Sequence, residues 1–330
     1  MSKRIAINGF GRIGRLTFRN LLKKEGIEVV AINDLTDNAT LAHLLRFDSA
    51  HGKFDGTVKS TDSTLVVNGK TIQASAERNP AALNWKELDI DLVLECTGFF
   101  RSKETAGLHI EAGARKVLLS APAKGAGIKT IVIGVNDQDL TDSDTIISNA
   151  SCTTNCLAPV CKVVDENFGF VKGSLTTTHA YTTDQNLQDA PHSDLRRARA
   201  AAFNIIPTST GAASAVGKVY PKVAGKFFAI ALRVPVITGS IIELNAIVEK
   251  EVSKEEINAV FKAAAEGSLK GILEYSTDPL VSSDIVRNTH SSIFDSLLTD
   301  TMGTMIKIIS WYDNEAGYAA RLADLSAMTV

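Results

Sequence analysis

The sequence predicts an α/β protein of two domains: a doubly wound parallel sheet, then an α+β domain with a mixed or antiparallel sheet. The chain has 330 residues, about twice the usual length of one domain. In its first half, short β-branched runs alternate with amphipathic helical patterns, which is typical of parallel strands joined by helices. After about residue 150 the alternating segments become longer, which favours antiparallel strands. We therefore divide the chain into residues 1–150 and 151–315, followed by a last helix at about 316–330.

Composition narrows the class of protein. Hydrophobic residues make up 45% of the chain and charged residues 22%, as in ordinary globular proteins. The net charge of −2 lacks the basic excess that nucleic-acid binding needs. No apolar run reaches the length of a membrane span, and no signal-peptide block opens the sequence. We expect a cytoplasmic protein with no nucleic-acid or membrane partner, whose four sparse cysteines are reduced thiols.

The first domain opens with a strand at 4–8, a glycine-rich turn and an amphipathic helix. Further buried strands are expected at 28–33, 91–96, 116–120, 130–135 and 145–148. Between them, Asn68-Gly69 predicts a hairpin joining 65–67 to 71–72, because these residues adopt the positive φ angles of a tight turn.

In the second domain, strands are expected at 174–181, 227–236, 239–249 and 304–312. Ser253 with Glu256 forms a capping box ahead of apolar residues at helical spacing, which predicts a helix across one face of this sheet.

Three glycines after the first strand carry the strongest motif. Gly9, Gly11 and Gly14 follow a strand and open a helix, and Asp34 ends the next strand twenty residues later. This is a Rossmann-type dinucleotide fingerprint, in which the turn approaches a pyrophosphate and the acid binds a ribose. A 2′-phosphate would meet the negative charge of Asp34, so NAD is favoured over NADP. The alternative is a glycine-rich turn that binds nothing.

Cys152 lies between a strand and a helical run, near the expected helix N-terminus. There the dipole and free amides favour a thiolate, which makes Cys152 a candidate nucleophile. The alternative, a buried structural thiol, stays open for Cys152 and is preferred for Cys156 and Cys161, which fall on the apolar helical spacing. Pro159 inside the run predicts a kink or a later helix start. Zinc is disfavoured, because no second cysteine or histidine pair has ligand spacing.

A base and an anion site complete the candidates. His179 lies in a polar strand end among hydroxyl residues, although the pattern cannot pair it with Cys152. Arg233 is a lone cation in an apolar strand and needs a carboxylate or a ligand phosphate as its partner. The cations Arg196, Arg197 and Arg199 form either an anion site or a solvated or subunit-contact face.

Several segments together resemble the glyceraldehyde-3-phosphate dehydrogenase family, in order and spacing and from end to end. They are INGFGRIGR (7–15), AINDL (31–35), ECTGFF (95–100), SNASCTTNCLAP (148–159), TTTHAYTTDQ (176–185), DLRRARAAAFNIIPTSTGAA (194–213), LRVPV (232–236) and SWYDNE (310–315). The resemblance implies reversible NAD-dependent conversion of D-glyceraldehyde 3-phosphate and inorganic phosphate to 1,3-bisphosphoglycerate in glycolysis. It also implies a homotetramer whose 181–203 loop reaches a neighbouring subunit, and a C-terminal helix that joins the NAD-binding domain.

The same resemblance implies a role for individual residues. Cys152 would form a hemithioacetal and then a thioester, with His179 as base. Thr182 and Arg233 would hold the phosphate of the substrate, and Ser151, Thr210, Gly211 and Arg197 the attacking phosphate, with Thr153 beside the thiol. Cofactor contacts would come from Gly9, Gly11, Arg12, Ile13, Gly14, Asp34, Arg78, Ser120 and Asn314, and no metal is implied.

Two positions depart from the pattern of the family. Ala316, close to Asn314, stands where members of the family commonly have a tryptophan. The loop around Gln188 lacks a proline that many NAD-specific members carry there.

Two rival functions remain open. One is erythrose-4-phosphate dehydrogenase, against which Thr210 and Gly211 argue. The other is a catalytically silent dinucleotide-binding or adhesion protein of the same fold, against which the joint presence of Cys152, His179, Arg233 and Asp34 argues.

Overall fold

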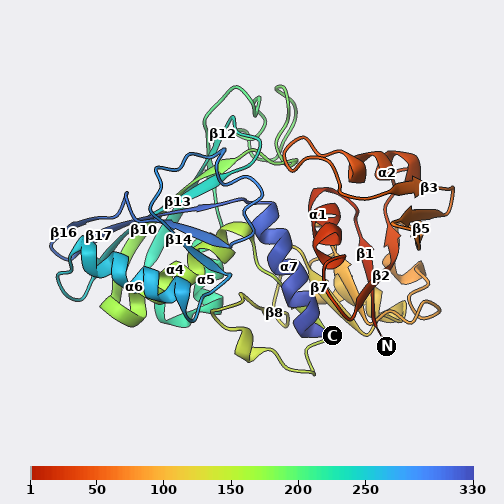
Figure 1. Cartoon of the computed structure of the whole chain (residues 1–330), viewed down its shortest axis with the longest axis horizontal. Helices are drawn as coiled ribbons and strands as arrows, with labels where there is room; N and C mark the ends of the chain where they lie inside the picture. The colour runs from red at the N-terminus through yellow and green to blue at the C-terminus, as the bar shows by residue number, and fades with distance from the viewer. Residues whose placement is uncertain (1) are drawn as a thin grey trace. The chain divides into compact units, whose positions relative to one another are not determined.

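The computed structural model describes residues 2–330, and these divide into two compact units (Figure 1). The first unit comprises the residues up to Ile131, Gln138–Ala150 and Ala319–Val330. The second comprises Val132–Asp137 and Ser151–Tyr318. Residues 132–137, which lie within the expected first domain, thus belong to the second unit. In the described part of the chain, no helix is long and apolar enough to span a membrane.

The first unit is built on a nine-stranded sheet with the order β3-β4-β5-β2-β1-β6-β7-β9-β8. Its strands are β1 (Lys3–Asn8), β2 (Ile27–Asn33), β3 (Val58–Ser60), β4 (Thr64–Val67), β5 (Lys70–Ser75), β6 (Leu92–Glu95), β7 (Lys116–Leu119), β8 (Lys129–Thr130) and β9 (Ile146–Ser148). From β5 to β8 all neighbours are parallel, whereas β3 pairs antiparallel with β4, and β4 with β5 through the predicted Asn68-Gly69 hairpin. The doubly wound parallel sheet predicted from the sequence is therefore confirmed.

Helices and short 3₁₀ turns connect these strands. The helices are α1 (Arg12–Leu21), α2 (Asn38–Arg46) and α3 (Lys103–Glu111), and the 3₁₀ turns are η1 (Pro80–Ala82) and η2 (Asp137–Asp139). The chain runs from β1 to β2 on one side, and β6 lies on the other side of β1. The carboxyl end of β1 is therefore a point where the strand order reverses, the usual binding position in such sheets.

The prediction of a strand at 130–135 is wrong for most of these residues. Only Lys129–Thr130 pairs with β9, and the chain then turns. Gly134 has φ +84°, and the side chain of Asn136 accepts a hydrogen bond from the Val132 N–H at 2.9 Å. The apolar residues Ile131, Val132 and Val135 are nevertheless buried, so the hydrophobic run reflects burial and not strand pairing.

The second unit holds a mixed eight-stranded sheet with the order β11-β12-β10-β13-β17-β15-β14, with β16 added beside β17. Its strands are β10 (Phe170–Ala180), β11 (Ile206–Ser209), β12 (Phe227–Val234), β13 (Ser240–Val248), β14 (Leu273–Ser276), β15 (Ser292–Asp295), β16 (Asp300–Met302) and β17 (Met305–Tyr312). The pairs β10·β12 and β14·β15 are parallel and the other pairs antiparallel. The predicted mixed sheet is confirmed.

Helices cover one face of this sheet. They are α4 (Cys152–Phe168), α5 (Ala212–Val219) and α6 (Lys254–Glu266), with the 3₁₀ turn η3 (Pro221–Val223), and they lie together on one side of the strands in Figure 1. Ser253 and Glu256 form the predicted capping box of α6. Helix α4 begins at Cys152 and continues through Pro159, so the proline does not delay its start. The last helix, α7, spans Ala316–Thr329.

A buried polar network lies at the carboxyl ends of β1 and β6. Trp85 donates its indole N–H to Nδ1 of His109 at 3.1 Å, so the imidazole proton is on Nε2, which lies 3.1 Å from the Glu95 carboxylate. Asn8 and the backbone N–H of Thr97 donate to the same carboxylate at 2.6 and 2.7 Å. Glu95 and His109 are almost completely buried. The network therefore satisfies a carboxylate that would otherwise be costly inside the unit.

We expect His109→Phe to lower the free energy of unfolding by about 2–4 kcal/mol, because the buried Glu95 carboxylate and the Trp85 indole each lose a partner. Urea-induced unfolding measures the change. The control is His43→Phe at an exposed helix position, which should change stability by less than about 0.5 kcal/mol. A loss for His109→Phe no larger than that of the control would contradict a structural role for the network.

Candidate active site

The thiol of Cys152 is placed by a strained turn and a helix cap. Strand β9 ends at Ser148, and Ala150 then adopts φ +57°, a conformation that non-glycine residues rarely take. Ser151 is the N-cap of α4, and its Oγ accepts the Thr154 N–H at 3.1 Å. Cys152 is therefore the first residue of α4, at the positive end of the helix dipole, as the sequence predicted.

His179 meets this thiol from the end of β10. Its Nε2 lies 3.4 Å from Sγ of Cys152. Its Nδ1 lies 2.6 Å from the Ala180 carbonyl oxygen, which can only accept, so this contact is a hydrogen bond in the tautomer that carries the proton on Nδ1. The lone pair of Nε2 is then directed to the thiol. The imidazole is 3% exposed and meets the ring of Tyr312 edge-on at 5.8 Å. The structure thus brings together the two residues that the sequence could not pair.

Arg233 lies beside the imidazole because β12 pairs in parallel with β10. The register sets His179 opposite Arg233, and Nη1 of Arg233 lies 2.8 Å from Nδ1 of His179 and 3.1 Å from the Ala180 carbonyl oxygen. Among the described residues, no carboxylate forms a salt bridge with this guanidinium. A half-buried cation without an anionic partner suits a ligand anion.

Burial and the charge of Arg233 set the protonation states. Burial, with the nearby cation, lowers the pKa of His179 to about 3, so the imidazole is neutral and able to accept a proton. Burial raises the pKa of Cys152, while the charge of Arg233 and hydrogen bonds with Thr153 oppose that rise. Burial therefore opposes the thiolate that the helix N-terminus and Arg233 favour. The neutral imidazole of His179 lies where it can take the thiol proton.

Arg197 is held in a network with acidic neighbours. Its Nε donates to Oγ1 of Thr208 at 2.9 Å and lies 3.6 Å from Asp194, while Nη1 forms an ion pair with Asp184. Of its neighbours in sequence, Arg196 is exposed and Arg199 pairs with Asp189 on the surface. An anion bound by Arg197 would therefore share this guanidinium with carboxylates.

The remaining predicted anion ligands lie on loops and helix ends of the second unit. Gly211 is the N-cap of α5 and provides no side-chain cap, and Oγ1 of Thr210 accepts the Ala212 N–H at 3.2 Å. Thr182 follows β10 and is half-buried. Thr153 differs from the others, because its hydroxyl is buried and lies 3.0 Å from the hydroxyl of Tyr312. That hydroxyl therefore fixes the helix start to β17.

The glycine turn of the first unit fits a dinucleotide. A Cβ on Gly14 would lie 2.2 Å from the carbonyl oxygen of Gly9, so helix α1 can approach β1 only without a side chain there. Gly9 has φ +92° and also lacks space for a Cβ. Gly11, in contrast, has open space around it and caps α1 without a side-chain bond. Internal packing explains Gly9 and Gly14, whereas Gly11 leaves room for a ligand against the amides of the helix N-terminus.

Asp34 is positioned beside this turn. One carboxylate oxygen accepts the Phe10 N–H at 2.7 Å and the other the Thr36 N–H at 3.0 Å, which leaves further lone pairs for ribose hydroxyls. Arg12 lies at the start of α1 and donates to buried Asp48 at 3.2 Å, with half-buried Ile13 next to it.

Two further predicted cofactor residues follow strands of the same sheet. Arg78 is exposed after β5, and Ser120 is half-buried directly after β7. Both strands run parallel to their neighbours toward the centre of the sheet, so these residues lie on the carboxyl side of the sheet, as a dinucleotide site requires.

Asn314 is buried in the second unit, just after β17. Its Oδ1 accepts the hydroxyl of Ser240 at 2.9 Å and lies 3.4 Å from Oγ1 of Thr238. The neighbouring Asp313 accepts from the backbone N–H groups of Glu315 and Ala316 at 2.9 Å, so it caps the start of α7.

Two further residues belong to this site without a signal in the sequence, Tyr312 and Ser240. The hydroxyl of Tyr312 lies 3.0 Å from Thr153 and 2.9 Å from Thr177, which ties the start of α4 to β10. Ser240 joins β10 to Asn314 through its side chain. Neither residue has a local signal, because both contacts arise from sheet pairing. Within residues 2–330, no group of three or more histidine, cysteine, aspartate or glutamate side chains is arranged to hold a metal ion.

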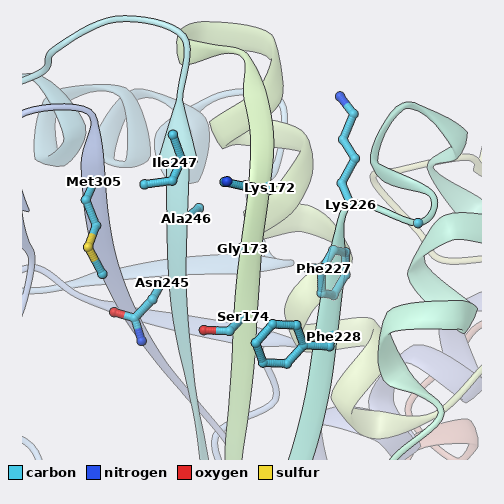
Figure 2. A pocket seen from close by; sticks show the side chains of 11 residues that line it. Lys172, Gly173, Ser174, Lys226, Phe227, Phe228, Asn245, Ala246, Ile247 and Met305 are labelled. Atoms are coloured by element: carbon cyan, nitrogen blue, oxygen red, sulfur yellow. The ribbon is translucent and has the colours of Figure 1, made fainter.

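A separate hollow lies on the sheet of the second unit, and no residue of α4 lines it. Its volume is about 510 Å³, and Figure 2 shows that Lys172, Ser174, Phe228, Asn245 and Met305 border it on β10, β12, β13 and β17. None of the candidate catalytic or anion-binding residues lines it.

Comparison with known proteins identifies the family. Residues 3–103 match the family described as glyceraldehyde 3-phosphate dehydrogenase, NAD binding domain, and residues 151–314 match its C-terminal domain. The chain is 56% identical to glyceraldehyde-3-phosphate dehydrogenase of Mycobacterium avium and 57% identical to that of Geobacillus stearothermophilus, in each case over 99% of this chain and 98% of the relative. The enzyme of Mycobacterium tuberculosis is 57% identical over 98% of both chains. With its NAD-binding sheet and its buried thiol–imidazole pair, the chain belongs to the glyceraldehyde-3-phosphate dehydrogenase family.

Proposed function

We propose that the protein oxidises D-glyceraldehyde 3-phosphate with NAD and inorganic phosphate to 1,3-bisphosphoglycerate, reversibly, as a step of glycolysis. The observation that carries the proposal is the 3.4 Å contact between Sγ of Cys152 and Nε2 of His179, with Nδ1 of His179 tied to the Ala180 carbonyl. This geometry provides a nucleophile with an adjacent, correctly oriented base.

In the first step, Nε2 of His179 accepts the thiol proton while Sγ of Cys152 attacks the aldehyde carbon. The imidazole returns this proton to the former aldehyde oxygen, so the hemithioacetal carries a hydroxyl and His179 is neutral again. The hydroxyl proton then passes to His179 as the carbon is oxidised and a thioester forms on Cys152. Bound NAD supplies the hydride acceptor for this step. The low pKa of His179, about 3, keeps the imidazole unprotonated between turnovers. An oxygen of inorganic phosphate then attacks the thioester, and the Cys152 sulfur leaves.

Two groups of residues are assigned to the two phosphates, on the basis of their charge and free amides. Arg233 lacks a carboxylate partner among the described residues, which supports its binding of the phosphate of the substrate together with Thr182. The attacking phosphate is assigned to Ser151, Thr210, Gly211 and Arg197, with Thr153 beside the thiol. The uncapped amides at Gly211 favour an anion at this point.

The cofactor contacts divide along the chain. Gly9, Gly11, Gly14, Arg12 and Ile13 are assigned to the pyrophosphate, and open space at Gly11 supports this assignment. Asp34 is assigned to the ribose, Arg78 and Ser120 to the adenine side, and Asn314 to the nicotinamide amide. Residues 1–150 with the helix at about 316–330 then form the NAD-binding domain, and residues 151–315 the catalytic domain.

The protein is further proposed to act as a homotetramer. Phe228 and Met302, on β12 and β16, are 76% and 75% exposed, and Ile230 of β12 is also exposed. The 181–203 loop exposes Leu187 and Leu195 to a similar degree. Large apolar side chains in such numbers are typical of a surface that another subunit covers.

A cytoplasmic location is proposed from the chemistry of the thiols. All four cysteines are free. The thioester can form only on a reduced Cys152, so the enzyme needs a reducing compartment.

We expect Cys152→Ser to lower kcat by about 10³-fold or more, because serine is a far weaker nucleophile at the same position. NADH formation from glyceraldehyde 3-phosphate, with and without inorganic phosphate, measures this. Cys161→Ser serves as the control, since that thiol is buried in α4 away from His179. Turnover independent of phosphate, or faster turnover with erythrose 4-phosphate, would support the rival dehydrogenase. No turnover by the reduced protein would support a silent binding protein.

The charge of Arg233 should set the reactivity of the thiol. Arg233→Met removes a positive charge that lies beside Cys152 and His179. The pKa values of both residues should therefore rise. We expect the pH profile of Cys152 alkylation by iodoacetamide to move about one pH unit or more to the alkaline side. Arg199→Met, at an exposed ion pair, should leave the profile unchanged. An acidic displacement with Arg233→Met would contradict this electrostatic assignment.

The carboxylate of Asp34 should set cofactor choice. Asp34→Asn keeps an oxygen for the Phe10 N–H and removes the charge. We expect the Kd of NAD to rise about 5–10-fold, and the preference for NAD over NADP to narrow by about tenfold or more, because repulsion of a 2′-phosphate is lost. Fluorescence titration measures both constants. Asp37→Asn, at a nearby exposed helix cap, should change neither by more than about twofold; an unchanged preference in Asp34→Asn would oppose the assignment.

A further inference from the structure

A chain of hydrogen bonds joins the base to Asn314 through Ser240. The carbonyl oxygen of Ala180 accepts from His179 and Arg233, and the N–H of the same residue lies 3.1 Å from Oγ of Ser240. Oγ of Ser240 in turn lies 2.9 Å from Oδ1 of Asn314. Ser240 is fully buried at the first position of β13. The residue next to the base and the residue assigned to the nicotinamide are therefore bridged by one hydroxyl.

The direction of each bond is fixed by chemistry. A backbone N–H can only donate, so Oγ of Ser240 accepts from Ala180 and keeps its single proton. The described residues offer this proton one acceptor, Oδ1 of Asn314. The amide of Asn314 is thereby oriented with its oxygen toward Ser240, and its NH₂ group keeps two donors for a ligand.

Thr238 favours the opposite orientation of the same amide. Its hydroxyl donates to the acceptor-only carboxylate of Asp313 at 2.8 Å, so toward Asn314, at 3.4 Å, it presents a lone pair. A lone pair attracts the NH₂ group of an amide and repels its oxygen. Ser240 therefore holds the Asn314 amide against the preference of Thr238.

We propose that Ser240 is a positioning residue that makes Asn314 a hydrogen-bond donor, so that Asn314 recognises the carbonyl oxygen of the nicotinamide carboxamide and not its NH₂ group. The inference rests on the proposed function, because it concerns the cofactor that Asn314 is assigned to bind. Removal of the Ser240 hydroxyl lets the amide reverse. The reversed amide presents an oxygen, which can accept from a carboxamide NH₂ but repels a ketone.

The test compares two dinucleotides. In 3-acetylpyridine adenine dinucleotide a methyl group replaces the NH₂ of the carboxamide, so only the carbonyl acceptor remains. The quantity measured is the Kd of this analogue divided by the Kd of NAD, by calorimetry on the intact protein without substrate. We expect Ser240→Ala to raise this ratio about 5–10-fold over wild type, the equivalent of one hydrogen bond in the analogue complex.

Two further variants separate orientation from general damage. Ser310→Ala removes another fully buried serine hydroxyl, on β17 of the same sheet, which bonds Ser292 at 2.6 Å, and it should leave the ratio unchanged. The double variant Ser240→Ala with Thr238→Val removes the lone pair that favours reversal. Its ratio should fall back to within about twofold of wild type.

The outcomes distinguish this inference from the function on which it rests. A ratio in Ser240→Ala that stays within about twofold of wild type, or one that Ser310→Ala raises equally, overturns the positioning role. A ratio in the double variant as high as in Ser240→Ala also overturns it. A wild-type protein that binds neither dinucleotide contradicts the proposed function itself.

Discussion

The hydrogen bond from Nδ1 of His179 to the Ala180 carbonyl oxygen is the constraint on which the site depends. In the tautomer with the proton on Nδ1, this bond leaves the Nε2 lone pair facing the thiol of Cys152. The bond is local, between adjacent residues at the end of β10, but its effect requires that α4 and β12 bring Cys152 and Arg233 to the same imidazole. Contacts at one backbone carbonyl therefore bring together an imidazole, a thiol and a guanidinium.

Burial gives these groups their chemistry. Loss of solvation lowers the pKa of His179 and raises that of Cys152. Arg233 stays charged beside them without a carboxylate among the described residues, and an incoming phosphate would satisfy it. Burial is thus the main cause of both pKa shifts, and the charge of Arg233 lowers the pKa of both groups.

In the first unit, hydrogen bonds between side chains hold the start of the glycine turn at Gly9–Gly14. The register of the central strands sets Asn8 beside Asn33 on one side and beside Glu95 on the other. Asn33 donates to Asn8 at 2.7 Å, and Asn8 donates to Glu95, so three parallel strands are joined by side chains directly below the turn. Gly9 follows Asn8 immediately, so the glycine turn starts from a fixed point. Rigid support of this kind lets a loop bind an anion without reordering.

The sequence alone determined the features that depend on neighbours along the chain. Alternation of strands and helices predicted the first sheet and longer alternating segments the second, and the spacing of Gly9, Gly11 and Gly14 with Asp34 predicted the dinucleotide turn, since these signals are local. Pattern could place Cys152 at a helix start but could not pair it with His179, and it overestimated the strand at 130–135, whose apolar residues are buried in a turn. Only the tertiary structure decided the pairing, the burial of the thiol and the bridge through Ser240. Each of these depends on strand register and burial, which bring together residues far apart in the sequence.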